Sequence, residues 1–179
     1  MYRSDQELVQ ACLAGEAGAW DVLVERYGRL VYSIPTRLGL GESDADDVFQ
    51  SVMSIVLRYL PSLRDEARLS AWLIRTTYRE SWRQAKEAKR RRGQALDDSW
   101  ADSGTPTDTQ VVRLERQQQV RQAMDQLDER CARLIRAFFF DTTTASYEEI
   151  AAELGMPVGS VGPTRARCFK KLERLLSDI

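Results

Sequence analysis

The stretch SYEEIAAELGMPVGSVGPTRARCFKKLERLL, residues 146–176, decides the fold of the C-terminal part of this chain. Ser146 and Glu149 have the spacing of a capping box, which predicts the start of a short helix. Gly155-Met156-Pro157 then predicts a tight turn, and a longer helix follows it. A short helix, a tight turn and a longer helix are the components of a helix-turn-helix motif.

The longer helix of this motif is predicted to present a polar stripe outward. Its members recur at spacings of four, three and four residues, and they are Ser160, Thr164, Arg167 and Lys171. Small polar side chains suit base edges and phosphates, and cations suit phosphate oxygens. The pattern therefore favours DNA binding over a helical hairpin that merely has a solvated basic face.

The chain before residue 93 also has helical patterning. Apolar residues follow spacings of three and four over 20–31 and 48–59, and Ser4-x-x-Glu7 is a second capping box. Ser43 is predicted to cap the helix that Pro61 stops, and no strand pattern occurs. An all-α chain follows. The acidic run at the start of that helix serves either helix capping or contact with a protein partner.

A further helix is predicted over 71–92, and it combines cations with aromatic residues. The cations recur every three or four residues, at Arg75, Arg79, Arg83, Lys86 and Arg90. Trp72, Tyr78 and Trp82 interleave with them. Cations together with aromatics suit nucleic-acid backbone and unstacked bases, although a charge run alone is usually a solvated face.

The segment GQALDDSWADSGTPTDTQ, residues 93–110, interrupts the helical patterning. It is rich in Gly, Ser, Thr and Asp and lacks Lys and Arg, which predicts a flexible acidic linker. We therefore expect two small helical domains, over 1–92 and 113–179, joined by a linker over 93–112. A helix is predicted from about Val112 to Gln126, and Asp128 is predicted to cap the helix after it. Trp100 is either docked on a neighbouring domain or incidental.

The composition argues against an enzyme, a metalloprotein and a membrane protein. Histidine is absent and no nucleophile has an evident base, so we expect no catalysis, metal or cofactor. The N-terminal segment is polar and no apolar run approaches a membrane span of about 20 residues, so we expect a soluble, cytoplasmic protein without membrane insertion. Cys12, Cys131 and Cys168 are far apart, and we expect them to be buried, reduced thiols.

With these elements placed, the chain resembles the extracytoplasmic-function sigma factors of the sigma-70 family over nearly its whole length. Asp44-Ala-Asp-Asp-Val-Phe-Gln50 is similar to the family's D-A-E-D-L-x-Q signature in region 2.2. Ala71-Trp-Leu-Ile-Arg75 resembles the start of the region 2.4 helix, and residues 89–92 resemble its basic end. Leu127-Asp-Glu-Arg130 and residues 146–155 resemble region 4.

The resemblance implies a DNA-binding subunit that directs bacterial RNA polymerase to promoters. It implies that Asp46, Asp47 and Gln50 dock on the clamp helices of the polymerase β′ subunit. The β flap is the implied polymerase contact of the region 4 domain, and the acidic linker is expected to thread the RNA-exit path. An anti-sigma factor is a further candidate partner.

The same resemblance implies where promoter DNA binds. The loop over 62–70 captures a flipped base of the −10 element, and the cationic helix holds the melted non-template strand. The implied −10 contacts are Arg64, Arg68, Arg75, Tyr78, Arg79, Trp82, Arg83, Lys86 and Arg90. The second helix of region 4 enters the major groove at the −35 element, and its implied contacts are Ser160, Thr164, Arg165, Arg167 and Lys171.

The sequence departs from the family pattern in both DNA-binding helices. Arg79 stands where the family usually has an asparagine, and Arg83 stands at a later aspartate position. In the recognition helix, Gly162-Pro163 is expected to delay or kink the helix, because proline lacks an N–H group. Arg165 falls where a buried leucine is usual. These differences bear on promoter preference.

Three other functions were weighed against the sigma factor. A stand-alone helix-turn-helix repressor or activator explains residues 146–176 but neither the aromatic-basic helix nor the acidic linker, and such proteins usually dimerise. A sigma-like decoy that binds polymerase or an anti-sigma factor is supported only by the departures at Arg79 and Gly162-Pro163. A nucleic-acid enzyme lacks candidate residues.

Overall fold

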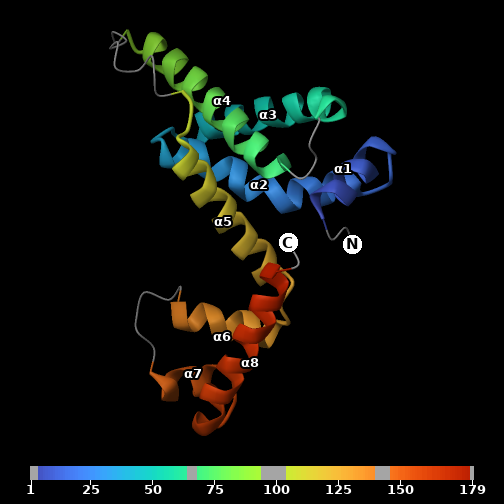
Figure 1. The fold of residues 1–179 in the computed structure, drawn as a ribbon. Helices are drawn as coiled ribbons and strands as arrows, with labels where there is room; N and C mark the ends of the chain where they lie inside the picture. The colour runs from blue at the N-terminus through green and yellow to red at the C-terminus, as the bar shows by residue number, and fades with distance from the viewer. Residues whose placement is uncertain (1–3, 64–67, 94–103, 140–145, 178–179) are drawn as a thin grey trace. The chain divides into compact units, whose positions relative to one another are not determined.

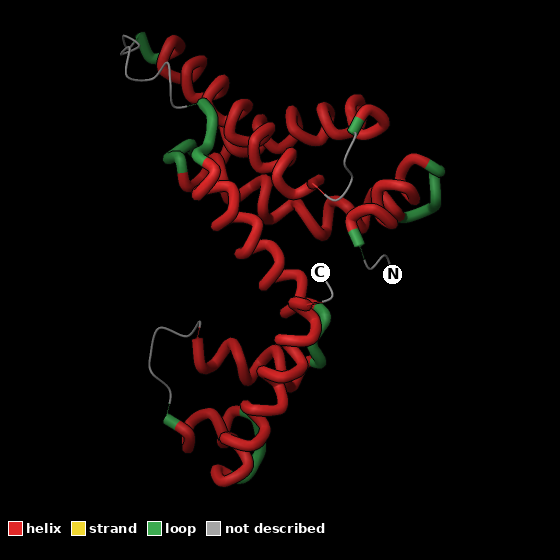
Figure 2. Tube along the Cα trace, viewed as in Figure 1, coloured by secondary structure: helices red, strands yellow, loops and turns green. Residues whose placement is uncertain are grey.

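The computed structural model describes residues 4–63, 68–93, 104–139 and 146–177, and its regular structure within these ranges is entirely helical (Figures 1 and 2). This confirms the predicted all-α class. The helices are α1 (Asp5–Leu13), α2 (Ala19–Arg37), α3 (Glu42–Tyr59), the short 3-10 helix η1 (Leu60–Ser62), α4 (Leu69–Arg91), α5 (Asp108–Asp125), α6 (Glu129–Phe139), α7 (Tyr147–Glu153) and α8 (Val158–Ser177). Residues 94–103 of the predicted linker, which include Trp100, lie outside the described residues.

The chain divides into two compact units, residues 1–118 and 119–179. The boundary falls inside α5, so this helix supplies its first turns to the first unit and its last turns to the second. Helix α5 also begins four residues earlier than the sequence pattern predicts. Thr107 and Gln110 account for this start, because each side chain bonds the other's backbone N–H, at 3.2 and 2.8 Å.

The first unit has a core built by α2, α3 and α4, with α1 and the start of α5 packed on it. Buried apolar side chains recur at spacings of three and four on each helix, which is why each helix buries one face. Examples are Leu23, Tyr27, Leu30 and Ile34 on α2, Val48, Val52 and Val56 on α3, and Leu69, Leu73 and Ile74 on α4.

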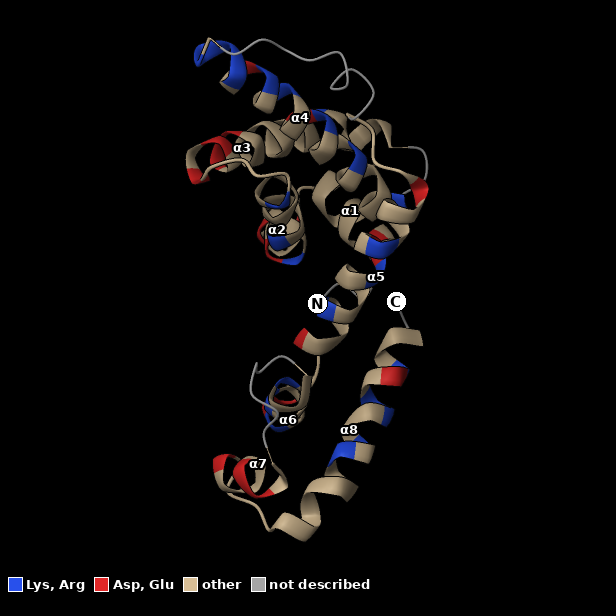
Figure 3. Ribbon diagram, turned by 90° about the vertical axis from the view of Figure 1, so that its left-hand side faces the viewer, with Lys and Arg blue, Asp and Glu red and all other residues tan. Residues whose placement is uncertain are grey.

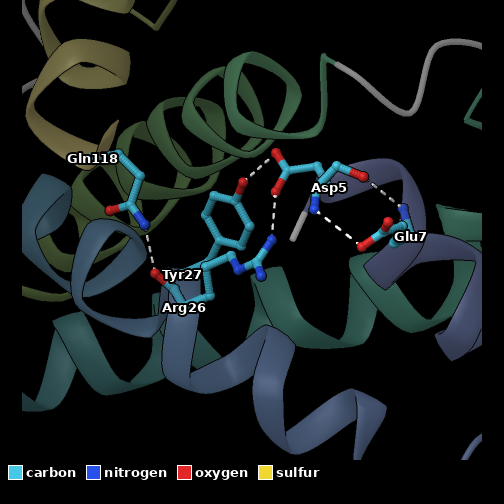
Figure 4. A network of polar contacts seen from close by, with 6 residues as sticks. Asp5, Glu7, Arg26, Tyr27 and Gln118 are labelled. Carbon is cyan, nitrogen blue, oxygen red and sulfur yellow. Dashed lines mark hydrogen bonds and ion pairs between the residues drawn. The ribbon is translucent and has the colours of Figure 1, made fainter. Parts of the chain in front are cut away.

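A polar network ties α1 and α5 to α2 (Figure 4). Asp5 of α1 accepts hydrogen bonds from the Tyr27 hydroxyl and, at 3.1 Å, from Arg26 Nη1. Gln118 of α5, at the C-terminal end of this unit, is buried. Its side-chain amide donates a hydrogen bond to the backbone carbonyl of Arg26. These contacts fix the first turns of α5 on the first unit.

The predicted helix starts are confirmed at three sites and wrong at one. Both capping boxes form, since Ser4 accepts from Glu7 N at 3.1 Å and Ser146 accepts from Glu149 N at 3.2 Å. Asp128 caps α6. Ser43 does not cap α3, because the helix begins at Glu42, two residues earlier than a Ser43 cap requires, and its N-cap residue Gly41 has no side chain to cap it.

The second unit consists of the end of α5 with α6, α7 and α8, and α8 packs on both α6 and α7. The turn between α7 and α8 passes through Gly155, whose φ of +60° lies in the left-handed region that favours glycine. The delay predicted at Gly162-Pro163 is wrong, because helix α8 starts at Val158 and continues through Pro163.

None of the helices in the described ranges is both long and apolar enough to span a membrane.

Candidate polymerase and nucleic-acid interfaces

The outer face of α3 carries the residues predicted to meet polymerase. Asp46, Asp47 and Gln50 are all exposed, and the helix buries the opposite face through Val48 and Val52. Asp46 also accepts a hydrogen bond from Tyr32 of α2. Partial burial raises the pKa of the Tyr32 hydroxyl, and the carboxylate of Asp46 raises it further.

The acidic start of α3 is partly balanced within the first unit. The Gln84 side-chain amide donates to Asp44 and to Asp47, both at 3.0 Å. Arg91, near the end of α4, pairs with Asp44 at 3.0 Å. Figure 3 shows this acidic start of α3 in red and the cationic end of α4 in blue. The acidic run therefore braces α3 against α4, a role that the sequence alone did not reveal.

The cationic stripe of α4 is on the surface as predicted. Arg75, Arg79 and Arg83 keep 46%, 67% and 57% of their side-chain surface exposed, and Arg90 is also exposed. Trp72, Tyr78, Trp82 and Lys86 are half-buried along the same helix. The opposite face packs in the core through Leu73, Ile74 and Thr77, among others.

A carboxylate that sequence reasoning missed lies within this stripe. Glu80 is 9% exposed and accepts a hydrogen bond from Arg83 Nε at 2.8 Å. Arg79 lies farther away, with its Nε 3.9 Å from the same carboxyl group. Arg83 is therefore engaged with its own helix, whereas Arg79 is held more loosely.

Residues from the second half of the predicted linker lie against the stripe. Arg75 pairs with Asp108 at the start of α5 at 3.0 Å. A Cβ atom built on Gly104 would lie 3.7 Å from Trp82. Part of the predicted DNA face is therefore adjacent to residues of the same chain in the first unit.

A hollow of about 600 Å³ opens between the end of α3, η1 and α4. Its wall includes two aromatic and two cationic side chains, Tyr59, Trp72, Arg58 and Arg79. It borders the loop predicted to capture a flipped base. Of the two cations predicted in that loop, Arg68 is exposed and Arg64 lies outside the described residues.

Helices α7 and α8 form the predicted helix-turn-helix. The buried stripe of α8 consists of Val161, Thr164, Cys168 and Leu172. The predicted exposure of Thr164 is therefore wrong, since this residue is 7% exposed. Spacing explains the error, because Thr164 fits the apolar stripe as well as the polar one. Ser160 is half-buried, and Arg167 and Lys171 are exposed.

Arg165 is engaged inside the second unit. Its guanidinium lies 5.0 Å from the Phe138 ring centroid and 5.8 Å from that of Tyr147, in cation–π geometry. This contact ties α8 to α6 and α7 at the position where the family resemblance predicts a buried leucine. Lys170 and Arg174, which the predicted polar stripe does not include, are also exposed on α8.

The expectation of three reduced cysteines is wrong for two of them. Cys131 and Cys168 form a disulfide between α6 and α8, whereas Cys12 is a free, buried thiol. Burial raises the pKa of the Cys12 thiol. Among the described residues, no group of three or more Cys, Asp or Glu side chains is arranged to hold a metal ion.

Comparison with known proteins shows what the chain is similar to. Residues 23–92, which span most of α2 through the end of α4, match the family model for sigma-70 region 2. The chain is 29% identical over 177 residues to the ECF RNA polymerase sigma factor SigM of Mycobacterium tuberculosis, covering 97% of this chain and 85% of that protein. It is also 29% identical over 188 residues to the RNA polymerase sigma-H factor of Pseudomonas aeruginosa, covering 96% of this chain and 91% of that protein.

A solved structure, that of CnrH in complex with the cytosolic domain of CnrY, aligns with 97% of both chains at 24% sequence identity and a TM-score of 0.40. This score is too low to establish a common fold over the whole chain.

Residues 23–92 therefore carry a sigma-70 region 2, and the chain is similar to these two sigma factors over nearly its whole length, which supports an extracytoplasmic-function sigma factor.

Proposed function

We propose that this chain is a sigma factor that binds core RNA polymerase through α3, opens promoters through α4 at the −10 element, and reads the −35 element through α8. The observation that carries the proposal is the exposed cationic stripe of α4 beside an aromatic-lined hollow. Cations supply sequence-independent attraction to phosphates, and aromatic faces stack on unpaired bases. Both are needed to hold a melted strand.

The hollow beside α4 is the proposed site of the flipped −10 base. A volume of about 600 Å³ is ample for one base. Tyr59 and Trp72 offer aromatic faces in its wall, and Arg58 and Arg79 offer charges to the adjoining phosphates. The remaining cations of α4, from Lys86 to Arg90, continue along the backbone of the same strand.

The exposed face of α3 is the proposed polymerase site. Asp46, Asp47 and Gln50 share it, and Leu57 extends it as an apolar side chain that is 60% exposed. A partly apolar, acidic face is poorly suited to DNA and well suited to a basic protein surface. We assign it to the clamp helices of the β′ subunit and assign the second unit to the β flap.

Helix α8 is the proposed reader of the −35 element. Its exposed cations are Arg167, Lys170, Lys171 and Arg174. They suit phosphate contacts that position the helix in the major groove. Lys171 is paired with Asp128 at 2.6 Å, so this contact would be exchanged for a phosphate on binding. Thr164 and Arg165 are better placed to hold the helix than to meet bases.

The test is run-off transcription with core polymerase, the purified chain and a genomic fragment library. Transcript starts that share −10 and −35 motifs and vanish without the chain support the proposal. Arg79→Glu with Arg90→Glu should then abolish promoter opening and leave polymerase binding unchanged. These positions avoid Arg83, whose loss would also strand the buried Glu80. Arg29→Glu is the control, because it makes the same charge reversal at an exposed position of α2, away from α4 in the sequence.

Polymerase binding is tested separately with Asp47→Arg and Gln50→Arg. Both should weaken the affinity for core polymerase because they reverse or add charge on the exposed face of α3. Unchanged affinity for both variants would remove this assignment. Polymerase binding without dependent transcripts would instead favour a decoy, and DNA binding as a dimer without polymerase would favour a stand-alone regulator. An anti-sigma factor that covers α3 or α8 is a compatible further partner.

A further inference from the structure

The disulfide between Cys131 and Cys168 lies at the centre of the second unit. Cys131 is in the first turn of α6 and Cys168 is in the middle of α8, 37 residues later, with their Cα atoms 5.3 Å apart. The two residues are 5% and 1% exposed. The bond therefore joins α8, which carries the exposed cations, to α6, on which α8 packs.

The core around this bond is small. The surrounding cluster contains Ala123, Met124, Leu127, Ala132, Ile135 and Leu172. A second small cluster packs α7 against the opposite end of α6 and the first turn of α8. Domains of this size bury a modest fraction of their surface and are often marginal without a cross-link or metal. A cross-link between distant residues raises their stability by restricting the unfolded chain.

Two further contacts lie next to the disulfide, and one of them also joins the start of α6 to α8. Asp128 caps α6 by accepting from Cys131 N at 3.0 Å, and the same carboxylate pairs with Lys171 of α8. Lys171 lies one helical turn from Cys168. The ion pair and the disulfide thus attach the capped start of α6 to one turn of α8. This turn is next to the exposed cations Arg167 and Lys170.

We propose that Cys131 and Cys168 form a reversible thiol–disulfide site that sets the order of α8 within the second unit. In a reducing compartment a disulfide is usually transient and sensing rather than permanent. Oxidation would therefore lock α8 in place, and reduction would loosen it. The consequence for −35 binding rests on the proposed function: the oxidised chain should bind the −35 duplex more tightly.

The redox cycle needs a hydroperoxide as the oxidant and a dithiol as the reductant. With a hydroperoxide, one cysteine thiolate attacks the peroxide oxygen to give a sulfenic acid and water or an alcohol. The second thiol then displaces water as the S–S bond forms. With a dithiol reductant, one thiolate attacks Cys131, the more exposed sulfur-bearing residue, and the reductant's second thiol closes its own disulfide and frees both cysteines.

Cys12 supplies an internal control. It belongs to the first unit, it is a free buried thiol, and its raised pKa keeps it protonated and unreactive. Cys12→Ala should leave the redox response of the second unit unchanged. The Cys131→Ala, Cys168→Ala double variant should lose that response altogether.

The experiment uses the full chain after hydrogen peroxide and again after dithiothreitol, with thiols counted under denaturing conditions and amide hydrogen exchange followed by mass spectrometry. We expect one free thiol after peroxide and three after reduction. Exchange in α6 and α8 should accelerate by about 30-fold or more on reduction, while α2 and α3 stay unchanged. The wild-type comparison requires no substitution, so a poorly folded variant does not weaken it.

Three free thiols after peroxide, or equal exchange in both states, would overturn the proposal. Binding of a −35 duplex by the holoenzyme is measured in parallel, with Lys170→Glu as the probe of α8. If reduction accelerates exchange but neither reduction nor Lys170→Glu weakens −35 binding, the redox site stands and the −35 assignment of α8 fails. The experiment therefore distinguishes a failure of the redox site from a failure of the −35 assignment.

Discussion

Replacing Tyr59 by alanine tests the proposed base-binding hollow most directly. Tyr59 ends α3, lines the hollow and is 50% exposed. Stacking of a base on an aromatic ring contributes about 1–3 kcal/mol, so its loss should weaken the open promoter complex about 5- to 150-fold.

The cost to folding should be much smaller. Full burial of a large apolar side chain contributes about 1.5–3 kcal/mol, so a half-exposed ring should contribute about 1 kcal/mol. Leu13→Ala is the matched control, because Leu13 is 41% exposed at the end of α1 and far from the hollow in the sequence. Both variants should retain most of their stability, measured by chemical denaturation.

The assay follows promoter opening through a fluorescent base analogue at the −10 element, with core polymerase in excess so that its binding is not limiting. The loss caused by Tyr59→Ala should be the same at low and high salt, because a neutral ring releases no counterions. The loss caused by Arg79→Gln should shrink as salt rises. Opening within about twofold of the wild type for Tyr59→Ala, or an equal loss for Leu13→Ala, would refute base stacking in this hollow.

Three further predictions concern the second unit. Arg165→Ala should reduce its stability by about 0.5–2 kcal/mol in denaturant titration, because the cation–π contact with Phe138 is lost. The pKa of Asp128 is lowered from the ordinary 3.8, mainly by its hydrogen bond from Lys171, so Asp128 stabilises the fold above that value and the contribution disappears as pH falls through the lowered pKa. Thermal melts of Asp128→Asn, which keeps a capping group, should therefore show a weaker loss of stability on acidification. Lys170→Gln should reduce the slope of log affinity against log salt for the −35 duplex by about 0.9.

Local signals in the sequence predicted much of the fold. Each of the two capping boxes and the Asp128 cap depends on residues three apart, so no tertiary information is needed to find them. The same rule would have found the start of α5, where Thr107 and Gln110 have the required spacing. The prediction for Ser43 fails because Gly41, in an extended conformation, is the N-cap residue. The helix therefore begins at Glu42, and Ser43 lies inside its first turn.

The site was less predictable because its side chains meet across helices. Arg91 and Asp44 are 47 residues apart, and the disulfide joins residues 37 apart, so spacing within one helix cannot reveal either pair. Thr164 illustrates a different limit. A stripe chosen by polarity predicts that it faces outward, whereas it lies on the buried face of α8 with Val161 and Cys168. Periodicity defines which residues share a face, and tertiary contacts decide which face is buried.

The internal pairing of α4 cations bears on how strongly the free chain can bind DNA. Within the described residues, Arg75 pairs with Asp108, Arg83 with Glu80 and Arg91 with Asp44. Each phosphate contact by these cations must replace an existing carboxylate contact, so little net electrostatic energy is gained. Because the formal net charge of the chain is only −1, no long-range attraction compensates. Tight promoter binding therefore requires a partner that adds affinity and positions the strand, which is the contribution expected of core polymerase.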